Sequence, residues 1–294
     1  MSNHFGGSWT FQKVRIIEEY AKAYLQIMKE HPYWKLMYFD GFAGTGEFQV
    51  KGKMTSGFFE DNTIGLFDGA ARTIASITQP KPFDMCYFVE LEKQKAALLR
   101  ASIEKIRESG VYVVEQDCNE KILKLADFLT GKLGMDGKKY KVLAFIDPFG
   151  MNVQWSSIEA LRGLGVDMWI LAPTGIGANR LLSRDGQIPD AWASKLESFF
   201  GVSKELIYGN IYTETTQTDL FGNSTTSLQK NKKALSEINK MYSERLSTVF
   251  KYVSNPYDMR NSSNSTMYHL YLASNNTTAV KIANDIVLKY NLKH

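Results

Sequence analysis

The stretch that decides the fold is Tyr38-Phe39-Asp40-Gly41-Phe42-Ala43-Gly44-Thr45-Gly46. It begins as a short apolar strand, reaches a carboxylate at Asp40 and continues into a turn with three glycines in six positions. Glycine allows positive φ and lets a ligand approach without obstruction from a Cβ atom. Free backbone N–H groups in such a turn suit the anionic end of a ligand. The stretch therefore predicts the binding edge for a nucleotide-like cofactor.

The composition is that of an ordinary globular protein, with 294 residues, 44% of them hydrophobic and 22% charged. No apolar run approaches the roughly 20 residues that cross a bilayer, and residues 1–11 lack a hydrophobic signal core. We therefore expect a cytoplasmic protein without a membrane partner. The two cysteines form no CxxC pair and the four histidines are scattered, so we expect no metal site.

Apolar strands alternate with helical periodicity from the N-terminus to residue 171. Strands are expected at 36–39, 85–89, 111–115, 142–146 and 168–171, and helices at 12–31, 64–77, 94–109, 119–133 and 156–164. The strands are continuous apolar runs, which is typical of a parallel sheet covered on both faces. Because crossovers in such sheets are right-handed, the sequence predicts a doubly wound α/β sheet.

The regular alternation stops after residue 171. Residues 173–233 form a long insertion, with helices expected near 190–200 and 204–208 and a polar run at 213–227. Segments of this length are usually functional, so we interpret it as a substrate-recognition segment, with a harmless insertion as the alternative. A helix at 228–246, two strands at 249–253 and 267–273 that can pair as a hairpin, and a final helix at 278–290 complete a single domain of residues 1–294.

The expected strands make a mostly parallel seven-stranded sheet with a C-terminal antiparallel hairpin. This inventory is similar to that of the class I S-adenosylmethionine methyltransferases, which are Rossmann-like. A plain nicotinamide-binding sheet would lack the antiparallel hairpin strand.

Carboxylates stand at the ends of the first four strands: Asp40, Glu90, Asp117 and Asp147. In an open α/β sheet the ligand lies beyond the carboxyl ends of the strands. If the ligand is S-adenosylmethionine, Glu90 accepts hydrogen bonds from the ribose hydroxyls, Asp117 from the adenine amine and Asp40 from the α-ammonium. The cofactor-binding residues that this interpretation predicts are Asp40, Gly41, Phe42, Ala43, Gly44, Gly46, Glu90, Leu91, Asp117 and Cys118.

A dinucleotide is the alternative cofactor. Its fingerprint is GxGxxG, whereas this turn has the spacing Gly41-x-x-Gly44-x-Gly46, and Asp40 would repel a pyrophosphate. A strand-end carboxylate can also cap a helix, an alternative that is strongest for Asp117. The Cys118 side chain lacks the preceding proline of a cytosine-C5 nucleophile, so we interpret it as a structural thiol.

The segment Asp147-Pro148-Phe149-Gly150 resembles the catalytic loop of methyltransferases that act on exocyclic amines, written (D/N/S)-P-P-(Y/F). There the acidic side chain and a proline carbonyl accept hydrogen bonds from the target amine, so catalysis is mainly positioning, and the aromatic ring stacks on the base. We expect Asp147, Pro148 and Phe149 to be catalytic. This chain departs from the pattern in having one proline and an aromatic residue one place early, and an ordinary Asp-Pro turn is the alternative.

Nearly the whole chain resembles the three-Cys-motif partner (TcmP) proteins. The matching segments are the helical opening Lys13 to Tyr24, Tyr38 to Gly46, Phe88-Val89-Glu90, Phe145 to Gly150 with Trp155, Ala172-Pro173-Thr174 with Asn179-Arg180, and Tyr271 to Ser274. The segment between Gly46 and Ala70 departs from the family pattern. The resemblance implies a class I methyltransferase whose partner is a three-cysteine, radical-S-adenosylmethionine-like protein. Arg180 is expected to contact a phosphate or a cofactor carboxylate and Trp155 to shape the target pocket, against a solvated arginine and a packed tryptophan as alternatives.

The sequence therefore predicts an S-adenosylmethionine-dependent methyltransferase that acts on an exocyclic amine of a nucleobase in DNA or RNA. Two alternatives stay open: a cofactor-binding partner protein with little activity alone, and a methyltransferase for a small molecule or a protein. The formal net charge of +4 is compatible with nucleic acid but is too small to decide between them.

Overall fold

The computed structural model describes residues 8–51, 64–218, 221 and 224–292. Its main sheet has the order β10-β12-β7-β6-β1-β4-β5, and β11 also pairs with β12. The strands are β1 (Lys35–Asp40), β4 (Met85–Glu90), β5 (Val111–Glu115), β6 (Tyr140–Ile146), β7 (Val166–Ala172), β10 (Tyr252–Val253), β11 (Tyr257–Arg260) and β12 (Thr266–Ser274). Strands β5, β4, β1, β6 and β7 are parallel, and β12 is antiparallel to β7. The doubly wound sheet with an antiparallel C-terminal hairpin is confirmed. The strand expected at 249–253 is wrong over its first part, because a helix runs to Val249, and the hairpin is formed by β12 with β11, which was not expected.

The strands are apolar throughout because both faces of the sheet are buried. Along β1, Leu36 and Tyr38 point into one hydrophobic core and Met37 and Phe39 into the other, and all four are at most 4% exposed. Alternate residues of a strand face opposite sides, so a sheet covered on both faces needs apolar residues at every position.

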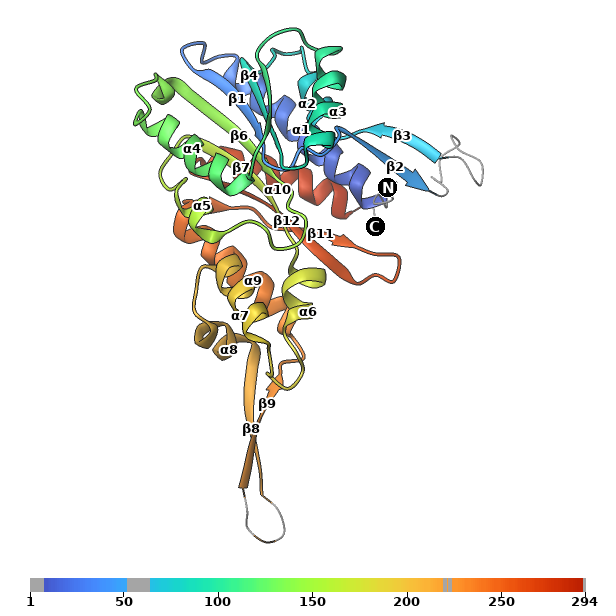
Figure 1. Cartoon of the computed structure of the whole chain (residues 1–294), viewed down its shortest axis with the longest axis vertical. Helices are drawn as coiled ribbons and strands as arrows, with labels where there is room; N and C mark the ends of the chain where they lie inside the picture. The colour runs from blue at the N-terminus through green and yellow to red at the C-terminus, as the bar shows by residue number, and fades with distance from the viewer. Residues whose placement is uncertain (1–7, 52–63, 219–220, 222–223, 293–294) are drawn as a thin grey trace.

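Helices cover the two faces in separate groups (Figure 1). The first core includes α4 (Cys118–Thr130), α5 (Trp155–Glu159) and α9 (Ala234–Val249), with the short 3-10 helix Gly137–Lys139 beside α4. The second core includes α1 (Ser8–Met28), α2 (Ala70–Ala75), α3 (Lys93–Glu104) and α10 (Thr277–Asn291). Helices α1 and α10 also pack on one another, where Lys289 Nζ and the Tyr290 hydroxyl reach Glu19, each at 2.8 Å.

The helix expected at 64–77 is wrong over its first half. Ile64–Asp68 forms β3, which pairs antiparallel with β2 (Glu47–Lys51), and the helix α2 begins only at Ala70. The hairpin partner lies in a segment to which the sequence analysis assigned no strand. A non-local pairing of this kind overrides the helical periodicity of a short apolar run.

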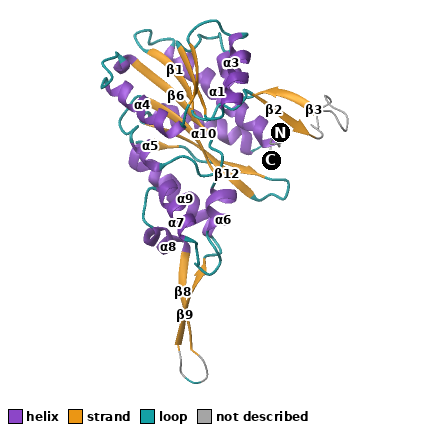
Figure 2. Cartoon of the chain, in the orientation of Figure 1, coloured by secondary structure: helices purple, strands orange, loops and turns teal. Residues whose placement is uncertain are grey.

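The insertion after β7 is built of short helices and one polar hairpin (Figure 2). A π-helical turn (Thr174–Ala178) leads through α6 (Asn179–Leu181) to α7 (Asp190–Phe200), α8 (Lys204–Ile211), β8 (Tyr212–Thr218) and β9 (Ser224–Lys230). The helix expected over 190–200 is confirmed. The helix expected from 228 is wrong over its first turns, because residues 228–230 pair with residues 212–214 in the hairpin and α9 starts at Ala234.

Aromatic packing fixes this insertion to the sheet. The Tyr242 ring of α9 stacks on Phe199 with centroids 4.7 Å apart and meets Trp155 edge-on at 6.1 Å. It also lies 6.0 Å from the ring of Tyr271 in β12. Buried aromatic pairs of this kind contribute about 0.5–1.5 kcal/mol beyond the area that they bury.

Two tyrosines of this cluster are expected to respond differently to loss of the hydroxyl group. Tyr242 Oη is buried without a hydrogen-bond partner in the described part of the chain, whereas Tyr271 Oη donates to Asn239. Tyr242→Phe should therefore leave the free energy of unfolding unchanged or raise it by up to ~1 kcal/mol, and Tyr271→Phe should lower it by about 1 kcal/mol. Urea unfolding of the two variants makes the comparison. Equal losses would show that the Tyr242 hydroxyl has a partner in solution.

Candidate functional site

The strand order reverses at β1, and this reversal positions the site. After β1 the chain runs to β4 and β5 on one side, then returns to β6 on the other side of β1. A crevice for a ligand opens where connections leave in opposite directions. Asp40 ends β1 opposite Phe145 of β6, and Asp147 follows the end of β6. The two carboxylates therefore stand at the mouth of this crevice.

The glycine turn is held between the two neighbouring strands. The Gly41 N–H donates to the carbonyl of Phe145 in β6, and the Ala43 N–H donates to the carbonyl of Val89 in β4, both at 2.9 Å. A Cβ atom on Gly41 would lie 2.6 Å from Cys118 Sγ, and Gly44 has a φ of +61°. Glycine is thus favoured at position 41 by close packing and at position 44 by backbone conformation.

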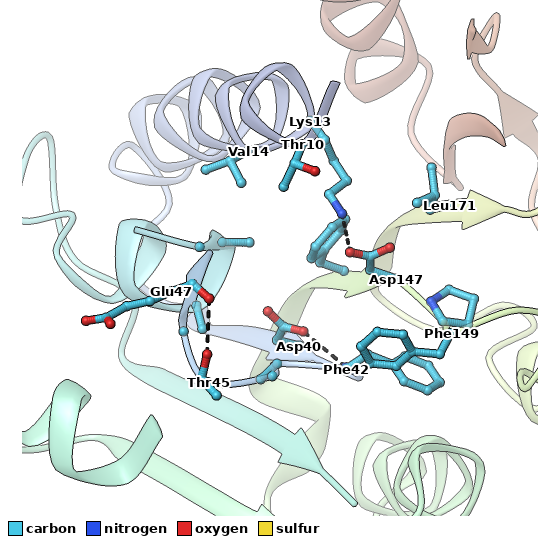
Figure 3. A pocket seen from close by; sticks show the side chains of 18 of the residues that line it. Thr10, Lys13, Val14, Asp40, Phe42, Thr45, Glu47, Asp147, Phe149 and Leu171 are labelled. Carbon is cyan, nitrogen blue, oxygen red and sulfur yellow. Dashed lines mark hydrogen bonds and ion pairs between the residues drawn. The ribbon is translucent and has the colours of Figure 1, made fainter. Parts of the chain in front are cut away.

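A first cavity of ≈ 340 Å³ lies between α1 and the ends of β1 and β6 (Figure 3). The predicted residues that line it are Asp40, Phe42, Ala43, Gly44, Gly46, Asp147, Pro148 and Phe149. The glycine turn and the Asp-Pro-Phe segment therefore face one space. Lys13, Lys95 and Tyr268 line the same cavity and were not among the predicted site residues.

A second cavity of ≈ 710 Å³ adjoins the first and shares Phe42, Lys95 and Phe149 with it. The predicted residues found here are Gly41, Phe42, Glu90, Leu91, Asp117, Cys118 and Phe149. Together the two cavities bring together all ten predicted cofactor-binding residues and all three predicted catalytic residues. Their volumes are typical of pockets for small ligands.

Asp40 is buried, and its burial raises the pKa of its carboxyl group. The side chain is 1% exposed and accepts hydrogen bonds from the Phe42 N–H at 3.2 Å and the Tyr38 hydroxyl at 3.4 Å. Burial raises the pKa of Asp40 from 3.8 to about 7, the nearby Asp147 charge adds to the rise, and the Phe42 N–H, the Tyr38 hydroxyl and Lys13 oppose it. A cationic group bound beside Asp40 would favour the ionised form.

Lys13 of α1 forms an ion pair with Asp147 across the first cavity (Figure 3). Its side chain is 8% exposed, so the pair is largely shielded from water on the lysine side. The sequence held a signal for this residue: Lys13 precedes Ile16, Ile17 and Tyr20 by three, four and seven positions, which puts its charge on the apolar face of the helix. A charge at such a position needs a partner inside the protein.

Glu90 and Asp117 both hold backbone N–H groups in the second cavity. Glu90 accepts from Gly44 at 3.0 Å and from Glu92 at 2.9 Å, one bond to each carboxylate oxygen. Asp117 caps α4, where its Oδ1 accepts from Asn119 at 2.8 Å and from Glu120 at 3.2 Å. A carboxylate has about four acceptor positions, so each side chain keeps acceptor capacity. The ribose and adenine contacts stay predictions.

The remaining predicted residues differ in accessibility. Phe149 is 64% exposed at the boundary of the two cavities, with Lys95 Nζ 5.5 Å from its ring centroid. Cys118 is buried and burial raises its pKa, as expected for a structural thiol. Trp155 is 3% exposed, with Arg245 over its ring at 4.6 Å, and Arg180 is exposed in α6. Neither Trp155 nor Arg180 lines either cavity.

The donor set fits S-adenosylmethionine. Its adenosine end is polar and uncharged, and the second cavity offers carboxylate acceptors beside the exposed apolar side chain of Leu91. Its other end carries a sulfonium, an ammonium and a carboxylate, and the first cavity offers carboxylates, the glycine turn and lysines.

No helix among the described residues is long and apolar enough to cross a membrane.

Comparisons with known proteins gave structural neighbours only. No family model and no curated protein matches the chain. A Legionella pneumophila protein of the DUF519 family aligns at 16% identity over 90% of this chain and 97% of its own, with a TM-score of 0.40. Trm1 from Pyrococcus horikoshii, solved with S-adenosyl-L-methionine, aligns at 8% identity over 92% of this chain and 64% of its own, with a TM-score of 0.38. Spermidine synthase from Thermotoga maritima aligns at 10% identity over 94% of this chain and 62% of its own, with a TM-score of 0.42.

The strand order and the antiparallel β12 make this a Rossmann-like, doubly wound α/β fold. Because no family model matches, the resemblance to the TcmP proteins stays a prediction.

The raised pKa of Asp40 predicts a stability that depends on pH. The folded state binds this proton more tightly than the unfolded chain does, so the stabilisation is present below about pH 4 and is lost as the pH rises to about 7. Asp40→Asn should remove this loss. Relative to wild type, the variant should gain on the order of a few kcal/mol between pH 4.5 and pH 8.

Urea unfolding at several pH values measures this difference. Asp136→Asn, at an exposed aspartate paired with Lys139, is the matched control and should follow wild type. Parallel curves for Asp40→Asn and wild type would show that Asp40 is ionised across the whole range.

Proposed function

We propose that this protein is an S-adenosylmethionine-dependent methyltransferase that modifies an exocyclic amine of a nucleobase in DNA or RNA. One observation carries the proposal: the glycine turn and the Asp147-Pro148-Phe149 segment line a single cavity. That cavity adjoins a second one that contains Glu90 and Asp117. A cofactor extended across both would bring its reactive end to the Asp-Pro-Phe segment.

The bound cofactor would supply an electrophilic methyl group on a positively charged sulfur. Glu90 and Asp117 would hold its adenosine end, and Asp40 with the turn at Gly44 would hold its amino-acid end. The carboxylates at this rim suit a cationic sulfonium, because opposite charges attract more strongly in a partly desolvated site.

The residues of the Asp-Pro-Phe segment would position the acceptor. The Asp147 carboxylate would accept a hydrogen bond from the target amine and orient its nitrogen lone pair toward the methyl group. Phe149, exposed at the boundary of the cavities, would stack on a flat base, an interaction that contributes about 1–3 kcal/mol. Orientation of two reactants can reach effective molarities of about 10⁵–10⁸ M, so positioning alone is a sufficient source of catalysis.

A second candidate is a cofactor-binding partner protein with little activity alone, as the resemblance to TcmP proteins implies. The Lys13–Asp147 ion pair favours it, because a carboxylate engaged by lysine is not available to an amine. Such a protein would bind the cofactor and catalyse methyl transfer only together with its partner, for which a three-cysteine, radical-S-adenosylmethionine-like protein is the proposal.

A small-molecule or protein methyltransferase is the third candidate. A steep fall of affinity with salt would favour nucleic acid over the others.

Calorimetry with S-adenosylhomocysteine, followed by transfer of tritiated methyl groups to DNA, RNA and cell lysate, tests the proposal. We expect measurable binding and label in one nucleic acid. Absence of binding would overturn both the first and the second candidate, and binding without transfer to any acceptor would favour the second.

Asp147→Ala should lower kcat/KM by about 10²-fold or more, because the target amine loses its acceptor. Binding of S-adenosylhomocysteine should not be weakened. Asp136→Ala, which removes an exposed carboxylate outside both cavities, is the control. Full activity of Asp147→Ala would show that Asp147 does not position the acceptor.

A further inference from the structure

We propose that Lys13 binds the α-carboxylate at the amino-acid end of the cofactor, and that this carboxylate competes with Asp147 for the Lys13 ammonium. The inference rests on the proposed function, since it requires S-adenosylmethionine in the site. It adds a binding residue that the sequence analysis did not identify. It also connects cofactor binding to whether Asp147 is paired with Lys13.

The charges that line the first cavity lead to this assignment. They are the carboxylates Asp40, Glu47 and Asp147 and the ammonium groups Lys13 and Lys95. Glu47 is paired with Arg72 at 2.6 Å, so the remaining carboxylates face the cavity with two lysines. The α-ammonium of the cofactor suits the carboxylates, but its α-carboxylate needs a cationic or N–H partner.

Lys13 suits this carboxylate better than Lys95 does. Lys95 lies at the boundary of the two cavities, where it pairs with Glu92 at 2.8 Å and lies near the Phe149 ring. Lys13 lines only the first cavity, and its charge lowers the pKa of Asp40, which marks it as electrostatically close to Asp40. An amino acid whose ammonium lies at Asp40 would thus have its carboxylate toward Lys13.

A second donor lies one helical turn before Lys13. The Thr10 hydroxyl is buried, lines the first cavity and has no hydrogen-bond partner among the described residues. Residues three apart share a helix face, and the side chains of Thr10 and Lys13 both extend from α1 toward the cavity in Figure 3. A buried hydroxyl without a partner is costly, and a ligand carboxylate would accept its hydrogen bond.

Competition follows from the surroundings of the ion pair. Removal of one partner from a shielded pair leaves an uncompensated charge, which is strongly unfavourable. A ligand carboxylate replaces the charge of Asp147 at Lys13, so Asp147 can leave without that penalty. The Asp147 side chain is 23% exposed, so water can solvate it once released. Cofactor binding would then free the Asp147 carboxylate to accept a hydrogen bond from the target amine. The cofactor would therefore bind before the substrate that receives the methyl group.

The test compares two ligands by calorimetry: S-adenosylhomocysteine, and 5′-methylthioadenosine, which lacks the amino-acid end. Lys13→Met should weaken binding of the first about tenfold or more and change binding of the second less than about twofold. Lys13→Arg should restore most of the loss. Lys22→Met, at an exposed lysine on the same helix, is the matched control.

Asp147→Asn tests the competition. It should tighten S-adenosylhomocysteine binding several-fold in the Lys13 protein and have no effect in the Lys13→Met background. Equal affinities of wild type and Asp147→Asn, or equal losses for both ligands in Lys13→Met, would overturn the inference while leaving the proposed function intact. A wild-type protein that binds neither ligand would instead refute the proposed function.

Discussion

The reversal of strand order at β1 is the constraint on which the site depends. The chain leaves β1 in one direction and returns to its other side at β6, so a crevice forms at the carboxyl ends of these two strands. Asp40 and Asp147 end or follow the strands that border this opening. The hydrogen bonds of Gly41 to β6 and of Ala43 to β4 then fix the turn relative to both neighbours. The chemistry of the site thus follows from connectivity before any single side chain is considered.

The sequence predicted correctly those strands and strand-end residues that are determined by the hydrophobic pattern of a short segment. Continuous apolar runs such as Leu36–Phe39 predict strands buried on both faces, and the carboxylates that follow them must meet at one edge of the sheet. The β2–β3 and β8–β9 hairpins were missed because their strands are specified by each other. The polar residues 213–218 and 224–227 have no apolar alternation that would mark a strand.

The candidate site was predicted where residues follow strands and missed where a helix supplies them. Glu90 and Asp117 reach the cavity through their positions at strand ends. Lys13 reaches it only because α1 packs on one face of the sheet with its N-terminal part beside the first cavity, a tertiary arrangement that periodicity does not give. Asp117 lines the second cavity and also caps α4. A carboxylate between a strand and a helix predicts either role, so the sequence pattern does not distinguish a ligand contact from a helix cap.

The contact between the first and last helices sets the order in which the protein can be completed. Glu19 of α1 pairs with Lys289 of α10, 270 positions later. During synthesis the residues of α10 follow those of the whole sheet, so the contact between α10 and α1 forms after the strands have been made. Until then α1 packs on α2 and on the face of the sheet without the support of α10. The helix that carries Lys13 into the wall of the first cavity is thus supported by a segment that lies 270 positions further along the chain.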